Sequence, residues 1–236
     1  MGGMFPDLEE RPSDSPLVER VWRSNSERAG TFTSISKVCW SLVVSTLQGR
    51  VAVSLHGPET GVAAERFPPE LEWFGIDFKL GAFLPNIPPG LLRQGCVTLP
   101  DAVGRSFWLN GSALQFPNYE NADTFVDRLV REGLLTRDSI ADDLDEKPTL
   151  PLSVRAVQYR FLHSTGLSQR TARQIQRAHD AATLLKQGVS ILDTVFETGY
   201  SDQPHLTRSL KQYIGRTPSE IRTAPIVGLR PSSSIA

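Results

Sequence analysis

Apolar residues follow two different spacings along the chain, one in each half. Between residues 17 and 116, short apolar runs rich in Val, Trp and Phe alternate with turn residues. Runs of this kind are typical of β-strands, and their number predicts a small barrel or sandwich. The runs include "VCWSLVVSTL", "VAVSL", "LEWFGIDFKL" and "CVTL", and the turns between them include "HGPETG", "LPNIPPG" and "LNGS".

Helical spacing begins near residue 118. In "ENADTFVDRLVREGLL", Phe125, Val126, Leu129 and Val130 repeat as on one face of a helix, and Gly133 is a suitable stop. The stretch "RDSIADDLDE" could form a second short helix, which "KPTLP" would end.

Four further helices are expected between residues 152 and 215. Each begins after a residue that can cap the free N–H groups of a first turn, and each ends close to a glycine. The second helix is the longest and carries a basic face at Arg170, Arg173 and Arg177. The expected N-caps are Ser153, Ser168, Ser190, and Ser201 or Asp202, and the expected stops are Gly166, Gly188, Gly199 and Gly215.

The first and the last of these helices repeat one pattern. A shift of 49 residues, from Ser153 to Asp202, places N-cap on N-cap, apolar residue on apolar residue and glycine on glycine. The stretch "ILDTVFETGYSDQPHLTRSL" has the helix, glycine-containing turn and helix of a helix-turn-helix. The matched pairs are Ser153 and Asp202, Val157 and Leu206, Phe161 and Leu210, Gly166 and Gly215, and Ser168 and Thr217.

These patterns predict an α+β protein with two domains. We expect a loose segment over residues 1–16, a β-rich domain over 17–117, a helical DNA-binding domain over 118–222 and a flexible tail over 223–236; the family resemblance described below implies a sensor or dimerisation role for the β-rich domain. Charge divides similarly: residues 1–147 carry 14 Lys and Arg against 21 Asp and Glu, whereas residues 148–236 carry 11 against 5. A basic half favours a polyanionic partner.

The start of the last helix supplies candidates for base contact. Pro204 lies in the first turn, where backbone N–H groups have no intrahelical partner, so it costs little there. If the apolar positions of this helix face the core, Gln203, Thr207 and Arg208 face outward. Gln suits adenine, Arg suits guanine, and the methyl group of Thr suits thymine.

The stretches "LSVRAVQYRFLHSTGLS" and "GYSDQPHLTRSLKQYIGRTPSEIR" resemble the AraC/XylS family of bacterial transcription regulators, over about residues 138–222. The resemblance implies two helix-turn-helix units bridged by a long helix, with recognition helices in successive major-groove faces of one DNA site. The base-facing residues that it implies are Arg155, Gln158 and Tyr159 in the first unit and Gln203, Pro204, Thr207 and Arg208 in the second, with Ser201 and His205 nearer to phosphate.

Three residues depart from the family pattern. Tyr159 stands where the family commonly has Arg, so the first unit is expected to read a different base or to contact only the DNA backbone. Thr194 and Val195 stand where an Ile-Ala pair is usual, and the branched Val195 could alter the angle between two helices. Tyr159 and Val195 keep open the interpretation of a protein–protein adaptor that does not read DNA.

The stretch "LEWFGIDFKLGAFLPNIPPGLL" is similar to the cupin-like sensor domains that precede such DNA-binding domains. In the family they bind a small effector, mediate dimerisation, or do both. Trp40, Trp73 and Phe78 could line an apolar effector pocket, or they could fill the core of the β-rich domain. The partners that the resemblance implies are double-stranded DNA, a small effector, a second copy of the chain and, for an activator, RNA polymerase.

The sequence offers little for catalysis or metal binding. His56 is the only histidine in the N-terminal half, too few for a metal-binding cupin, and neither a phosphate-binding loop nor a nucleophile elbow occurs. We therefore expect no metal, no cofactor and no enzymatic activity. Because we find neither a signal-peptide pattern nor a membrane-span pattern, we expect a cytoplasmic location and no membrane partner. The alternative to a DNA-binding regulator is a β-barrel small-molecule binder or enzyme with an accessory helical domain.

Overall fold

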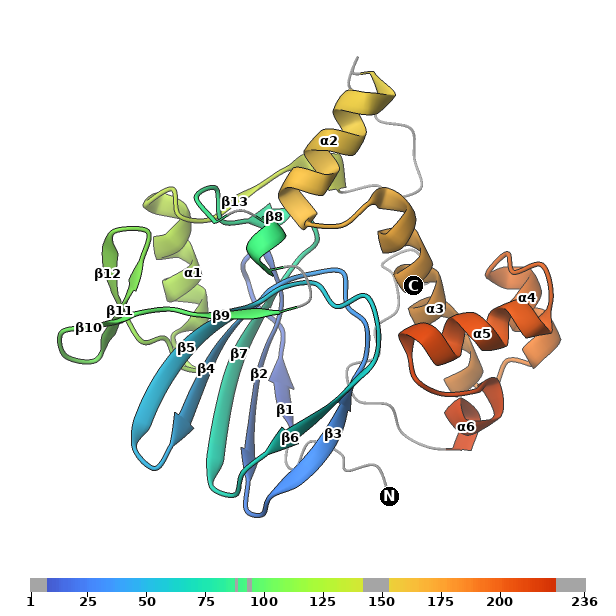
Figure 1. The fold of residues 1–236 in the computed structure, drawn as a ribbon, viewed down its shortest axis with the longest axis horizontal. Helices are drawn as coiled ribbons and strands as arrows, with labels where there is room; N and C mark the ends of the chain where they lie inside the picture. Colours follow the sequence, from blue (N-terminus) through green and yellow to red (C-terminus); the bar gives the residue numbers. More distant parts are fainter. Residues whose placement is uncertain (1–7, 88, 93–94, 142–152, 224–236) are drawn as a thin grey trace.

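The computed structural model describes residues 8–87, 89–92, 95–141 and 153–223. Figure 1 shows a sheet-rich half built from the N-terminal part of the chain and, beside it, a helical half built from the C-terminal part. The expected α+β class is therefore confirmed. No described helix combines the length and the apolar composition needed to cross a membrane.

An antiparallel sheet of six strands is the main layer of the N-terminal half, with its strands in the order β1-β2-β7-β4-β5-β9. β7 lies between β2 and β4, and all residues from Phe74 to Phe78 are buried. The strands are β1 (Glu9–Arg11), β2 (Val18–Ser26), β4 (Ser41–Leu47), β5 (Arg50–His56), β7 (Leu71–Phe78) and β9 (Cys96–Thr98).

Smaller sheets surround this layer. A two-stranded ribbon pairs β3 with β6, a three-stranded sheet joins β10, β11 and β12, and β8 pairs with β13. Their bounds are β3 (Gly30–Ser34), β6 (Ala63–Phe67), β8 (Ala82–Phe83), β10 (Asp101–Ala102), β11 (Ser106–Leu109), β12 (Ser112–Gln115) and β13 (Thr136–Arg137), and two short 3₁₀ helices are η1 (Pro89–Leu92) and η2 (Ser139–Ala141).

The core of the N-terminal half draws residues from the six-stranded sheet and from the three-stranded sheet. Val21 and Ile76 from the first and Phe107 and Leu114 from the second are fully buried in one apolar cluster. Two sheets that pack face to face bury the apolar side of each. The N-terminal half is therefore the sheet-rich domain that the sequence predicts.

Helix α1 (Ala122–Arg131) belongs to the N-terminal half, which differs from the expected boundary at residue 118. Its apolar residues Phe125, Val126 and Leu129 are buried in the same cluster as the sheets. Helical spacing indicates which face of a helix is buried, but not the element against which it packs. The β-rich half therefore extends beyond residue 117.

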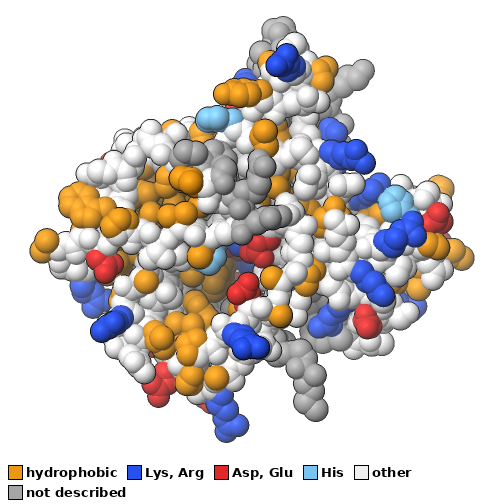
Figure 2. Space-filling model, viewed as in Figure 1, with side chains coloured by type: hydrophobic (Ala, Val, Ile, Leu, Met, Phe, Trp, Pro, Cys, Tyr) orange, Lys and Arg blue, Asp and Glu red, His pale blue; other side chains and the backbone are white. Residues whose placement is uncertain are grey.

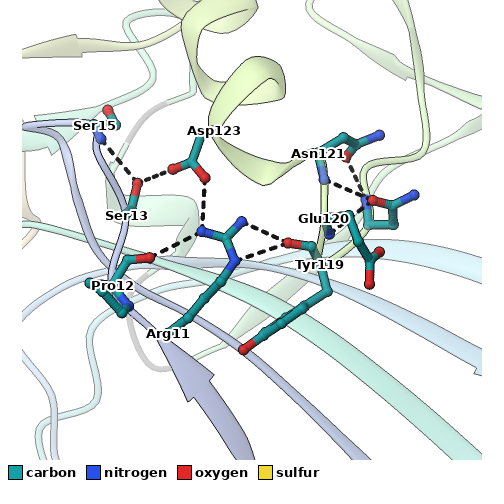
Figure 3. A network of polar contacts seen from close by, with 9 residues as sticks. Arg11, Pro12, Ser13, Ser15, Tyr119, Glu120, Asn121 and Asp123 are labelled. Carbon is teal, nitrogen blue, oxygen red and sulfur yellow. Dashed lines mark hydrogen bonds and ion pairs between the residues drawn. The ribbon is translucent and has the colours of Figure 1, made fainter.

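The segment expected to be loose is partly ordered, as Figure 3 shows. Residues 9–11 form strand β1 on the edge of the main sheet. The guanidinium group of Arg11 donates to Asp123 at 2.8 Å and to the carbonyl oxygen of Tyr119 at 2.7 Å, and Ser13 donates to Asp123. These partners lie more than 100 residues away in the sequence, so no local pattern could predict them. Residues 1–7 and 224–236 lie outside the described residues.

The helical half contains five described helices, of which α3 is central. The helices α4, α5 and α6 pack against α3, whereas α2 packs against β8, η1 and η2 as well as α3. Of the short helix expected in "RDSIADDLDE", η2 is described and residues 142–152 lie outside the described residues. The helices are α2 (Val154–Thr165), α3 (Gln169–Lys186), α4 (Ile191–Glu197), α5 (Gln203–Tyr213) and α6 (Pro218–Thr223).

The core of the helical half includes residues of the N-terminal half. Ile35, just after β3, is 8% exposed and lies in the same cluster as Phe161, Ile175 and Leu210. Leu80 packs against that cluster too. The two halves therefore share apolar contacts.

Candidate nucleic-acid interface

The helix α2 begins and ends where the sequence predicts. The hydroxyl oxygen of Ser153 accepts a hydrogen bond from the N–H of Ala156 at 3.2 Å, which satisfies a donor without an intrahelical partner. Gly166 ends the helix with φ of +75°, a conformation that favours glycine. Val157 and Phe161 are buried on the face toward the helical core.

The helix α5 has the same construction. Asp202 caps it by accepting from the N–H of His205 at 2.6 Å, and this hydrogen bond lowers the pKa of Asp202. Pro204 lies in the first turn, and Leu206 and Leu210 are fully buried. Gly215, with φ of +79°, occupies the position of Gly166 in the first copy.

The turn after each helix also matches. Ser168 caps α3 by accepting from the N–H of Thr171 at 3.1 Å, and Thr217 accepts from the N–H of Glu220 at 3.3 Å at the start of α6. The 49-residue repeat is thus a structural repeat, because every matched pair has the same physical role in its own copy.

The outward faces of both helices carry the residues expected to meet DNA. In α2, Arg155, Gln158 and Tyr159 are exposed, and Tyr159 stacks on His163 with ring centroids 6.1 Å apart. In α5, Gln203 and Arg208 are exposed and Thr207 is half-buried. Ser201 and Pro204 are exposed and His205 is half-buried.

The imidazole ring of His205 contacts Ser201 and Tyr200, the residues just before α5. Its Nδ1 lies 3.1 Å from the hydroxyl oxygen of Ser201, and its ring meets the ring of Tyr200 edge-on at 5.0 Å. These contacts orient the imidazole against the first turn of α5.

Tyr200 fixes the turn between α4 and α5. Its hydroxyl group lies 2.7 Å from that of Ser209 in a buried hydrogen bond, and the guanidinium of Arg177 lies 4.4 Å from its ring centroid. Burial raises the pKa of Tyr200, so its hydroxyl keeps its proton. This contact joins the turn to both α3 and α5, although Tyr200 was not among the expected site residues.

The two departures in α4 fit within the domain. Thr194 is fully buried, and its hydroxyl donates to the carbonyl oxygen of Ser190 at 2.8 Å, so the buried polar group is satisfied. Val195 is half-buried against the helical core. Both residues serve the packing of α4.

Basic side chains gather over the helical half in Figure 2, whereas apolar side chains are more prominent over the sheet half. Part of this charge faces inward. Arg170, Arg173 and Arg177, the expected basic face of α3, line a large open cavity between the two halves. This face of α3 therefore borders a cavity that residues of the N-terminal half also line.

The cavity has a volume of about 1980 Å³ and includes two of the three expected pocket residues. Trp73 and Phe78 lie in its wall, whereas Trp40 does not. Trp40 is buried and stacks on Phe78 with centroids 3.9 Å apart, and its indole N–H donates to the carbonyl oxygen of Ala82. Trp40 and Phe78 both lie in the buried core of the sheet half, whereas Trp73 is only partly buried.

A charged network lines the sheet side of the cavity. Asp77 accepts from Arg20 at 2.6 Å and from Ser41 at 2.6 Å, and Lys37 pairs with Glu59 at 3.2 Å. Burial raises the pKa of Asp77, but the charges of Arg20 and Lys37 outweigh it and hold that pKa at about 2. These charged residues were not expected in the pocket.

His56 also lies in this wall and is neutral near pH 7. Burial lowers its pKa to about 4, and the nearby charge of Lys37 acts in the same direction. Within the described ranges, no three His, Cys, Asp or Glu residues come together as a metal site.

Comparisons with known proteins match the helical half. A profile of the helix-turn-helix domain family matches residues 149–224. The HTH-type transcriptional regulator RipA of Corynebacterium glutamicum is 33% identical over 100 residues, and this match spans 42% of the chain but 30% of the length of RipA.

Two solved structures of ToxT from Vibrio cholerae align with 92% of the chain and 99% of ToxT. Their identities are 11% and 10%, and their TM-scores are 0.39 and 0.36. The family match, the resemblance in sequence and the repeated helices agree on the C-terminal part of the chain. Residues 149–224 match the helix-turn-helix domain family.

Proposed function

We propose that the chain is a sequence-specific DNA-binding transcription regulator. The observation that supports this most directly is the presence of two matched helices, α2 and α5, whose polar outward faces are exposed. A helix of this kind reads base edges from the major groove. Two such helices on one chain would contact successive major-groove faces of one DNA site.

The two proposed recognition helices, α2 and α5, are called the readers below, and their outward side chains differ in chemistry. In α5, Gln203, Thr207 and Arg208 would meet bases with Pro204, while Ser201 and His205 would lie nearer to phosphate. In α2, Arg155 and Gln158 would read bases, and Tyr159 would contact a thymine methyl group or the DNA backbone. The second unit would then contribute more of the sequence preference.

A small effector would bind in the cavity between the halves. Trp73 offers apolar surface on the sheet side, with the fully buried Phe78 behind the wall, and the arginines of α3 form part of the opposite wall. A ligand that contacted both walls would stabilise one arrangement of the halves over others, which is what regulation of DNA binding requires. Dimerisation through the N-terminal half, action inside the cell and, for an activator, contact with RNA polymerase are parts of the same proposal.

The test is selection of bound sites from random duplex DNA, followed by a salt series on the selected duplex. We expect two short conserved half-sites and an affinity that falls steeply as salt rises, because phosphate contacts release counterions. A chain that binds no duplex at low salt, as a monomer or as a dimer, would contradict the proposal.

A second candidate is a small-molecule binder or enzyme in the sheet half. The charged network of Asp77, Arg20, Lys37 and Glu59 in the cavity wall favours it. A ligand that raised the melting temperature without changing DNA affinity would support this candidate over an effector-controlled regulator.

A further inference from the structure

The two proposed readers are held in different ways. The helix α5 packs along α3, together with α4 and α6. The helix α2 joins α3 through the short turn at Gly166 and Leu167, and it also packs against β8, η1 and η2. The direction of α2 relative to α5 therefore depends on elements outside the family-matched residues 149–224.

An ion pair fastens α2 to the N-terminal half. The guanidinium of Arg160 donates to both carboxylate oxygens of Asp138, at 2.6 Å and 3.2 Å. The N–H of Asp138 donates to the carbonyl oxygen of Gly81 at 2.9 Å, next to the short pair of β8 and β13. A planar, two-point pair fixes orientation as well as distance.

The sheet side also meets the end of α2 directly. The ring of Phe83, in β8, lies edge-on to the ring of His163, with centroids 6.2 Å apart. The side chain of Asp138 is 13% exposed, so its pair with Arg160 is partly shielded from water on the carboxylate side. We call this set of contacts the α2 tie.

A serine of the N-terminal half fastens α5. Both the N–H and the hydroxyl group of Ser36 donate to the carbonyl oxygen of Tyr213, at 2.9 Å and 2.8 Å. Tyr213 is the last residue of α5, where carbonyl groups lack intrahelical partners, so Ser36 acts as a C-cap supplied by another part of the chain.

The same serine reaches α3. Its carbonyl oxygen lies 2.7 Å from Nε2 of His179, which is buried, and Ile35 beside it packs into the helical core. Ser36 thus connects α3 and α5 to the segment between β3 and β4. We call these contacts the α5 tie.

We propose that the α2 tie and the α5 tie set the distance and direction between the two readers, so that Arg160, Asp138 and Ser36 are positioning residues for the choice of half-site spacing. This rests on the proposed function. Two linked readers gain affinity only if they can engage their half-sites at the same time. With both ties in place, the N-terminal half holds the two readers at one distance and direction, which fits one spacing between DNA half-sites. Without them, the turn at Gly166 lets α2 follow a displaced half-site.

The experiment compares spacing preference in the full-length chain. The probes are the duplex that the wild-type chain selects and versions with extra base pairs between its half-sites. The variants are Arg160→Met, Ser36→Ala and the double variant, and Arg131→Met is the matched control on an exposed position of α1.

For the wild type and the control, the altered spacing should cost about a hundredfold in affinity. The double variant loses the Arg160 ion pair and the Ser36 hydroxyl but keeps the backbone contacts of Ser36. The ratio between the two duplexes should therefore fall to about tenfold, because the two helices are held less firmly. Arg160→Met alone should lower the ratio as well, which keeps the test open if the double variant does not fold.

A variant that weakens binding to both duplexes by one factor, and so keeps the wild-type ratio, overturns the inference because that is the effect of lost stability. A wild-type chain that selects no duplex overturns the proposed function instead, so the two failures are distinguishable.

Discussion

Asp77 is a buried carboxylate in β7 whose partners come from the two neighbouring strands, β2 and β4. Arg20, in β2, and Ser41, in β4, donate to its oxygens at 2.6 Å, and the indole N–H of Trp22 donates at 3.1 Å. A buried charge is tolerated only with such partners, and removing one side of the pair leaves the other uncompensated. Asp77 therefore couples the stability of the N-terminal half to pH.

The variant Asp77→Asn should lower the free energy of unfolding by about 3 kcal/mol at pH 7, because Arg20 loses its buried counterion. Chemical unfolding monitored by circular dichroism checks this. Asp127→Asn, at an exposed position of α1, is the control and should change little.

The effect of Asp77 should disappear in acid. The folded pKa of about 2 lies below the ordinary value of 3.8, so the contribution is present above about pH 4 and is lost as the pH falls toward 2. The difference in unfolding free energy between wild type and Asp77→Asn should shrink over that range. A difference that stayed constant from pH 5 to pH 2 would show that another property of the variant causes it.

Arg208 is the residue of α5 best suited to read guanine. We expect Arg208→Ala to cost about 1–3 kcal/mol in binding to the selected duplex and to relax the preference at one base pair. Affinities for duplexes substituted at single positions measure both effects. Equal weakening on every sequence would mean that Arg208 contacts only phosphate.

At the scale of single elements, the N-caps place the helices. Asp202 begins α5 and Ser153 begins α2, each by a hydrogen bond to an N–H three residues later. Since a cap acts within four residues, its position can be read from a short stretch of sequence. The first turn of each reader is thus encoded locally.

Replacing the cap of α5 should destabilise that helix. Asp202→Ala should lower the free energy of unfolding by about 1 kcal/mol, whereas Asp202→Asn should retain most of it because Asn also caps. Urea unfolding followed by the helical circular dichroism signal compares the two. An equal loss in both variants would argue against the cap as the cause.

The predictable part of the structure follows from this locality. The starts and stops of α2, α3, α4 and α5, and the repeat itself, could be predicted because caps and glycines act between near neighbours. The half of the molecule to which α1 belongs could not be predicted, because the apolar face of α1 packs on strands that are distant in the sequence. The same holds for Ser36, which meets Tyr213 across 177 positions.

At the scale of the whole molecule, the two halves share apolar core contacts and border an open cavity. The expected effector residues were aromatic, but the cavity wall also carries Asp77, Lys37 and the arginines of α3. The sequence does not indicate that charged residues far apart along the chain will come together in the folded protein. Only the arrangement of sheet and helices reveals their common position.

Ile35 tests the shared core. We expect Ile35→Ala to lower the free energy of unfolding by about 2–5 kcal/mol, although the residue lies in the N-terminal half, because it leaves a cavity among α3 and α5. Unfolding of the full chain measures the loss. Val103→Ala, at a position that is 98% exposed, should have almost no effect, and an equally small effect of Ile35→Ala would contradict the packing described.

The cap that Ser36 provides for α5 limits how this chain can be recombined with others. A hybrid that joined residues 149–224 to a foreign sensor would lack the hydroxyl group that satisfies Tyr213 and the Ile35 side chain that fills the space beside it. An exchange of N-terminal domains should therefore transplant the helices together with residues 34–38 of this chain, or supply an equivalent segment in the new partner. The position at which the chain can be divided for such a hybrid is therefore set by the contacts of Ile35 and Ser36, and not by the start of the family match at residue 149.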